Sequence, residues 1–314
     1  MFRTVCAWIL GRVGYLLYTL IVLVVCLWLL FPGSTARELF VRALNAAVPQ
    51  LEWRVQTISF ELPDALRLRG MEGRAAGGGG EPLLRIDSLT LRPDLMALVR
   101  QRRLQAAWQA ELAGGTVHGR LQLPRPGAEL RIEGTLQGVR LDGLAILERR
   151  LQRGLQGTAA ADFTATVRRS PLALTGLSAT ARLENGRIDL RQPVLGHGFV
   201  PFSRVGVSLL LQGERLALTD GTVDSNLFAG TFAGDLRLRP DPAASLITLT
   251  GSLQPRSEFF SAAGLSSAVL AEIRTRLRDR PLPFRVSGAL GDPGVHFEEF
   301  SLLFDALSKE ARTP

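Results

Sequence analysis

Hydrophobic and polar side chains alternate with a period of two along most of the chain after residue 50. In the first such run, Trp53 and Val55 alternate with Glu52, Arg54 and Gln56. Because successive side chains of a β-strand point to opposite faces, this pattern predicts strands with one apolar and one polar face. The body of the chain is therefore predicted to be mainly β-structure.

Turn-forming residues separate the alternating runs. Asn185-Gly186 stands between Leu183 and Ile188, and this pair is favoured in tight hairpin turns. The tetrapeptide QGER at 212–215 separates two further runs in the same way. We therefore predict hairpins at both places, within a long antiparallel meander that has one apolar face.

Three segments have helical rather than alternating spacing. The first, TARELFVRALNAAVP, begins with a possible capping box of Thr35 and Glu38 and ends at Pro49, which predicts a helix within 32–49. We expect it to cover one end of the following domain; the alternative is that it lies on a membrane surface. A second helix is predicted at 262–279 and a weaker one around 144–151.

The N-terminal segment 13–31, VGYLLYTLIVLVVCLWLLF, contains no charged residue. As a helix it would be about 28 Å long, which matches the hydrocarbon core of a bilayer. Arg3 and Arg12 precede it, so the positive-inside rule predicts a cytoplasmic tail at 1–12, a single transmembrane helix at 13–31, and residues 50–314 on the other side. The alternative is a signal peptide cleaved near the STA sequence at 34–36.

One strand pattern occurs twice. LAGGTVHGRLQL at 112–123 resembles LFAGTFAGDLRL at 227–238 with an offset of 115 residues, and GTLQ at 134–137 resembles GSLQ at 251–254 with an offset of 117. Similar offsets in consecutive elements predict a duplicated unit, at about 83–197 and 198–314. The alternative is that glycine-rich hairpins have converged on similar sequences.

The predicted apolar face needs a cover, which another sheet, helices or a non-protein apolar molecule could provide. The predicted helices are few and short, so we expect a hydrophobic groove that is only partly covered. The residues expected to line it alternate along two neighbouring strands: Val205, Val207, Leu209, Leu211, Leu216 and Leu218.

Composition and motifs give no indication of a catalytic, metal or nucleic-acid site. The net charge is +8, but the arginines are scattered along alternating runs, which is typical of the solvated face of a sheet rather than of a nucleic-acid site. Cys6 and Cys26 are the only cysteines, and His118, His197 and His296 lack metal-ligand spacing. No nucleophile-elbow, zincin or phosphate-loop motif occurs. We expect no enzyme activity, no catalytic residue, no metal, no cofactor and no nucleic-acid partner.

The order of these features resembles a known family. After the apolar segment, which ends in LWLLFPG, come ISFELPDALRLRGM, PLLRIDSLTLRPDLMALV and AELAGGTVHGRLQL, and later ARLENGRIDLRQPVLG and LRLRPDP. This pattern, over roughly 14–298, resembles protein N of the bacterial type II secretion system in its long form, which is related to the AsmA-like periplasmic proteins. The resemblance implies a single-pass inner-membrane anchor, a periplasmic β-domain and an accessory place in the secretion machinery. The AsmA-like group implies an elongated, curled sheet with a groove that accommodates lipid.

Two functions are therefore expected. The first is a non-enzymatic inner-membrane accessory of type II secretion, with other secretion components as its partners. The alternative is an AsmA-like lipid-binding or lipid-transfer protein. In both, a single N-terminal transmembrane helix is followed by an elongated, curled antiparallel β-sheet domain with a few short helices.

Overall fold

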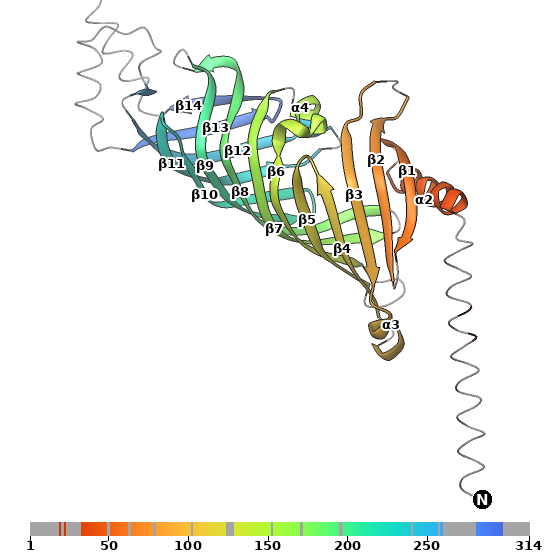
Figure 1. Ribbon diagram of the computed structural model, residues 1–314. Helices are drawn as coiled ribbons and strands as arrows, with labels where there is room; N and C mark the ends of the chain where they lie inside the picture. The colour runs from red at the N-terminus through yellow and green to blue at the C-terminus, as the bar shows by residue number, and fades with distance from the viewer. Residues whose placement is uncertain are drawn as a thin grey trace, which may run out of the picture.

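The computed structural model describes residues 19, 22, 33–48, 51–61, 64–77, 80–101, 103–123, 129–151, 153–169, 172–194, 197–239, 241–256, 258–259 and 281–297. Within these residues the fold is mainly β: one open antiparallel sheet of fourteen strands, whose order in the sheet is their order in the chain. The predicted mainly β fold with few helices is confirmed (Figure 1).

The strands are β1 (Leu51–Glu61), β2 (Ala65–Ala75), β3 (Leu84–Pro93), β4 (Leu104–Leu112), β5 (Gly115–Leu123), β6 (Leu130–Arg140), β7 (Leu155–Arg169), β8 (Leu172–Val194), β9 (His197–Gln212), β10 (Arg215–Asp224), β11 (Phe228–Arg237), β12 (Leu246–Pro255), β13 (Leu282–Ala289) and β14 (Asp292–Phe297). The helices are α2 (Gly33–Ala47), α3 (Leu95–Gln101) and α4 (Ala145–Leu151), with 3-10 turns η1 (Leu141–Gly143) and η2 (Pro242–Ala244).

The register of the strands places apolar residues in continuous rows across the sheet. One row of consecutive partners crosses every strand from β1 to β14 and contains only apolar residues and glycine: Phe60, Leu66, Leu91, Trp108, Gly119, Gly134, Phe163, Ala179, Leu209, Leu218, Gly234, Leu249, Val286 and Val295. The adjacent row is polar from β1 to β10: Ser59, Arg67, Thr90, Gln109, His118, Thr135, Asp162, Thr180, Ser208 and Thr219. The sheet therefore has one apolar and one polar face over most of its length.

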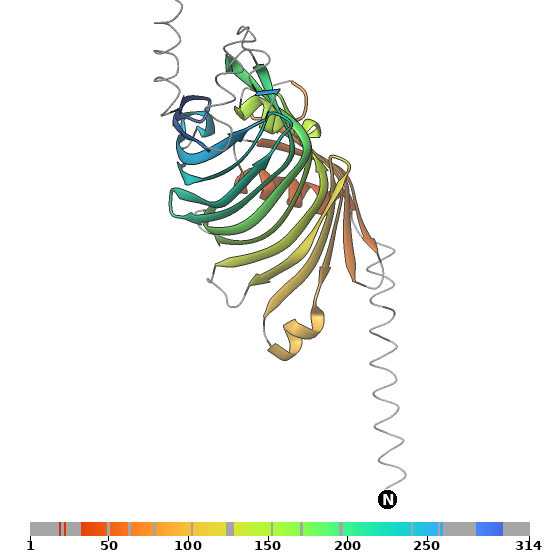
Figure 2. The ribbon, with the colours of Figure 1, turned by 90° about the vertical axis from the view of Figure 1, so that its left-hand side faces the viewer.

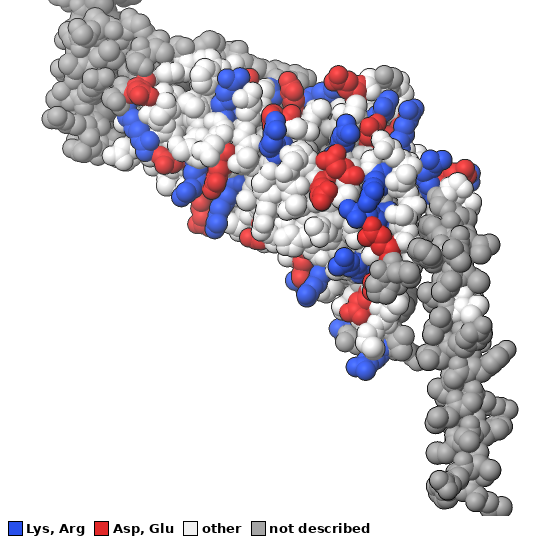
Figure 3. Space-filling view, viewed as in Figure 1, with Lys and Arg blue, Asp and Glu red and all other residues white. Residues whose placement is uncertain are grey.

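The sheet curls around its apolar face. The strands bend in a common direction, so the sheet forms an open trough (Figures 1 and 2). Apolar side chains from every strand between β8 and β14 line one shared cavity, which requires their face to be the concave one. The charged side chains are spread over the opposite face, as Figure 3 shows.

Glycines in the apolar row allow neighbouring strands to approach closely. A Cβ atom at Gly119 would overlap the carbonyl oxygen of Glu133, and one at Gly134 would lie 2.7 Å from the ring of Phe163. The space above Gly134 is shared by Phe163 and Trp108, whose ring centroids are 6.5 Å apart. Gly119 therefore allows the backbone of β6 to approach, and Gly134 makes room for aromatic side chains.

We expect Gly119→Ala to destabilise the sheet by about 1–3 kcal/mol, because the added methyl group collides with rigid backbone. The measurement is the free energy of unfolding in denaturant. Gly198→Ala is the matched control, since a Cβ atom there meets nothing within 4 Å. Equal stability of the two variants would contradict the close approach at Gly119.

Helix α2 covers the N-terminal end of the trough. Phe40, Val41 and Leu44 pack against a buried cluster that includes Trp53 and Leu68. The side-chain oxygen of Asn45 accepts a hydrogen bond of 2.8 Å from the backbone N–H of Trp53. The helix thus shields the apolar surface and a backbone donor of the edge strand β1. It begins at Gly33, two residues before the predicted cap Thr35.

The connection between β6 and β7 contacts turns at the opposite ends of the strands. Turns after even-numbered strands lie at one end of the strands, and turns after odd-numbered strands lie at the other end. Helix α4, which follows β6, contacts η2, which follows β11. Arg153, just after α4, donates a hydrogen bond of 3.3 Å to the carbonyl of Gly291 in the turn after β13. The sheet therefore arches over the concave face at this point.

The predicted hairpin at Asn185-Gly186 is wrong, because both residues lie inside β8, a strand of 23 residues. Asn185 has φ +49°, the left-handed conformation that also occurs in hairpin turns. Here it forms a bulge, because Asn185 and Gly186 stand opposite Gly157 alone between the pairs Thr158–Glu184 and Gln156–Arg187. The turn predicted at 212–215 does connect β9 to β10, with Gly213 at φ +62°.

Several predicted segments fall on residues that the structure does not describe. The transmembrane segment 13–31 lies outside the described residues except for Thr19 and Val22, and so do Arg3, Arg12 and the cytoplasmic tail 1–12. The helix predicted at 262–279 also lies outside them. No helix in the described part of the chain is long and apolar enough to cross a membrane.

The two similar stretches lie on β5 and β11 of the same sheet. Gly119 pairs with Gly134, and Gly234 pairs with Leu249, so both strand pairs follow the offset of 115. The GSLQ sequence is therefore displaced by two residues along β12, which keeps its side chains on the same faces as those of GTLQ. The duplication of 83–197 as 198–314 stays a prediction.

Candidate apolar binding site

The concave face of the trough is the candidate site. The register places the six predicted groove residues together on this face: Leu209 lies opposite Leu218, Leu211 lies opposite Leu216, and Val205 and Val207 continue along β9. Leu211 is buried, whereas the side chains of the other five are half-buried. In the middle of the sheet the apolar surface is therefore partly open.

Towards the C-terminal end the trough deepens into a cavity of about 320 Å³. Among the described residues that line it, all are apolar except His197, and six are phenylalanines. The lining comprises Ile188, Leu190, His197, Val200, Phe202, Val205, Val223, Leu227, Phe228, Phe232, Leu249, Leu253, Phe259, Phe284, Val286, Val295 and Phe297. A cavity of this size is within the range of small-molecule sites, which begins at about 300 Å³.

Internal hydrogen bonds keep polar groups out of the cavity wall. In the turn between β10 and β11, the hydroxyl of Ser225 donates to the carbonyl of Pro201 at 2.6 Å and accepts from the N–H of Leu227 at 3.1 Å. The backbone N–H of Arg256 donates to the carbonyl of Leu227 at 2.8 Å. Because this turn satisfies its polar groups internally, its apolar side chains can face the cavity at no hydrogen-bonding cost.

Aromatic packing and one histidine form the remaining wall. Phe228 and Phe259 meet edge to face, with ring centroids 5.9 Å apart. The Nε2 atom of His197 lies 3.1 Å from the backbone carbonyl oxygen of Phe259, so it is within hydrogen-bond distance. His197, the single polar side chain among the described lining residues, therefore has a backbone partner.

Charge lies outside this site. Within the described residues, no charged side chain lines the cavity. The side-chain hydrogen bond from Arg140 lowers the pKa of Asp142, and the bond to Glu61 raises the pKa of Arg67. Neither pair lines the cavity, so the site offers an apolar ligand contact surface without charge.

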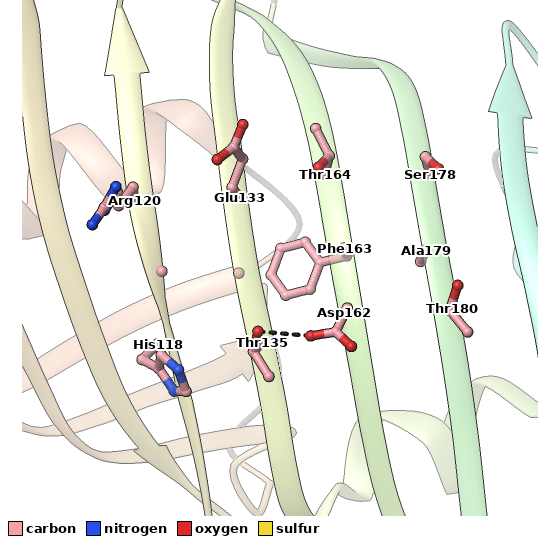
Figure 4. Close-up of a pocket in the computed structure, with 12 residues that line it drawn as sticks. His118, Arg120, Glu133, Thr135, Asp162, Phe163, Thr164, Ser178, Ala179 and Thr180 are labelled. Atoms are coloured by element: carbon pink, nitrogen blue, oxygen red, sulfur yellow. Dashed lines mark hydrogen bonds between the residues drawn. The ribbon is translucent and has the colours of Figure 1, made fainter.

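A second depression lies on the polar face and is wide open to solvent (Figure 4). It is lined by side chains from β5 to β8, with Arg120 and Glu133 on neighbouring strands. Its one hydrogen bond in Figure 4 joins the hydroxyl of Thr135 to Asp162 at 2.7 Å. His118, Arg120 and Asp162 are exposed, so the depression lacks the enclosure that would exclude water from a ligand.

Sequence reasoning found one wall of the site and missed the others. Val205 belongs to both the predicted groove and the cavity, whereas the five other predicted residues lie further along the trough. Phe284, Val286, Val295 and Phe297 were missed, although they alternate with Arg285 and His296 in the same apolar-polar pattern. The signal was present, but the curl that brings β13 and β14 towards β9 is not visible in a strand pattern.

Comparison of the chain with protein-family models, with curated proteins and with solved structures found no match in any of the three.

Proposed function

We propose that this protein binds lipid in its trough, with acyl chains against the concave face. The observation that carries the proposal is the apolar row that crosses all fourteen strands and leads into an apolar cavity of about 320 Å³. Covering one large apolar side chain stabilises a protein by about 1.5–3 kcal/mol, so a long row of half-exposed ones favours an apolar ligand. A flexible hydrocarbon chain has the shape and chemistry for such a surface.

The proposal includes the place of the protein in the cell. The uncharged segment 13–31 with Arg3 and Arg12 before it supports an inner-membrane anchor with the domain in the periplasm. In that position the trough would stand next to a source of lipid. An accessory role in type II secretion is a second candidate, supported by the order of sequence motifs, and the exposed polar face would be the surface that contacts other secretion components.

Site-specific photocrosslinking in the full chain tests the lipid proposal. A photoreactive benzoylphenylalanine replaces Phe232, which lines the cavity, or Thr231, its exposed neighbour on the opposite face. We expect a lipid adduct, identified by the mass of the crosslinked peptide, at position 232 and none at 231. This pair excludes lipid held around the membrane anchor, which would reach both positions equally. Adducts at neither position would contradict lipid binding, and protein adducts at 231 that include secretion components would support the accessory role.

A further inference from the structure

The connection between β3 and β4 presents an unusual concentration of exposed apolar side chains. Leu95, Met96 and Leu104 are 57%, 58% and 51% exposed. They are three of the ten large apolar side chains that are exposed within the described residues, and they lie within ten positions of one another. Helix α3 in this connection protrudes beyond the rim of the trough (Figures 1 and 2).

The protruding tip is an ordered unit. The carboxylate of Asp94 accepts a hydrogen bond of 2.8 Å from the N–H of Ala97 and so caps α3. The N–H of Asp94 donates to the carbonyl of Gln105 at 2.8 Å, which closes the base of the loop. Ala97 is buried, so Leu95 and Met96 stand outward on a fixed backbone.

The same connection carries exposed basic side chains. Arg92, Arg100 and Arg103 are exposed, and none of the ion pairs found within the described residues includes them. Basic side chains are visible at this end of the molecule in Figure 3. The one nearby acid in the connection, Asp94, is occupied by the helix cap. The tip therefore combines an apolar surface with an excess of uncompensated positive charge.

We propose that this tip, formed by residues 92–101, 103 and 104, docks on the surface of an anionic lipid bilayer. Exposed apolar side chains beside arginines are the combination that inserts shallowly into the headgroup region of anionic membranes. The concave face extends to this tip, because Leu104 lies on the same apolar side of β4 as Ala106 and Trp108. A docked tip would bring the rim of the trough against the bilayer. The docking depends on the tip alone and does not require lipid in the trough.

A fluorescent label on the full chain tests this contact. In a background with Cys6→Ala and Cys26→Ala, an environment-sensitive nitrobenzoxadiazole is attached at Met96→Cys, or at Thr248→Cys on the exposed polar face as control. The protein is reconstituted into vesicles of phosphatidylcholine, alone or mixed with phosphatidylglycerol, that contain a nitroxide-labelled lipid. At position 96 we expect a blue shift and nitroxide quenching that are several-fold larger in the anionic vesicles, and at 248 neither.

Substitution of two arginines tests whether docking depends on their charge. Each basic residue near an anionic surface contributes about fivefold to binding, so Arg100→Gln with Arg103→Gln should lower the docking equilibrium roughly 25-fold. Three results would overturn the proposal: no quenching at position 96, equal quenching in neutral and anionic vesicles, or quenching that is unchanged in the double variant. None of these readouts depends on the lipid adduct at position 232, so docking and lipid binding can fail separately.

Discussion

Leu209→Glu is expected to leave the domain folded and to abolish most lipid contact in the middle of the trough. Leu209 is half-buried on the concave face, between Ala179 of β8 and Leu218 of β10. Without ligand a carboxylate there keeps its water. Beneath an acyl chain it would lose that water without gaining a partner, which costs several kcal/mol for an ionised group, so we expect the affinity to fall by at least about 100-fold. The measurement is the yield of lipid adduct from benzoylphenylalanine at Val207.

The matched control is Leu210→Glu. Leu210 is the next residue along β9, is 46% exposed and lies on the opposite face, where Ser178 and Ala217 are its partners. We expect normal adduct yield and normal stability in this variant. Acidification should also restore lipid contact in Leu209→Glu, because the protonated acid is neutral and costs less to cover. Unfolding of Leu209→Glu, with no lipid on the unaltered protein, would instead indicate a closed core.

Leu68→Ala should destabilise the N-terminal part of the sheet by about 2–5 kcal/mol, since Leu68 has no exposed surface in the cluster beneath α2. The loss should stay local. Strands contact chiefly their neighbours in the chain, as in repeat proteins, so β8–β12 should keep their stability. Amide hydrogen exchange is the measurement, and we expect faster exchange in α2 and β1–β3 only.

Leu174→Ala is the control for this experiment. Leu174 is 46% exposed on β8, so the same truncation should change stability by less than about 0.5 kcal/mol. Faster exchange throughout the sheet in Leu68→Ala would show that the strands unfold as one cooperative unit. Unchanged exchange would show that Leu68 does not stabilise the cluster.

The alternating pattern predicted the strands because the two faces of this sheet have different surroundings. From Val205 to Leu211 the sequence pattern matches the side-chain alternation of β9, in which one face points to the concave side and the other to water. The pattern failed at Asn185, because a left-handed residue serves a bulge as well as a turn. The choice between them depends on β7 and β9, which continue past this point on both sides and hold β8 straight through it.

The curl of the sheet was expected only from the family resemblance, and the alternating pattern could not show which distant strands the curl brings together. Phe284 and Val205 are far apart in the chain, and each looks like an ordinary inward residue of its own strand. They line one cavity because the sheet bends, and the bend depends on cumulative twist, bulges and the contact of α4 with the opposite edge. Helix α3 was also missed, because its first five residues, LMALV, are all apolar and show no helical period.

The sequential strand order has a consequence for how the protein forms. Each new strand needs only the strand before it as a template. Folding can therefore begin at β1 and extend towards β14 before the C-terminal part of the chain is present. Contacts that are local in sequence close small loops, which makes each step fast. Apart from the outer edge of β1, which α2 partly shields, only the most recent strand has an unpaired edge at each stage, and the next segment to arrive covers it. A chain built in this way does not have to wait for its C-terminus before it acquires structure.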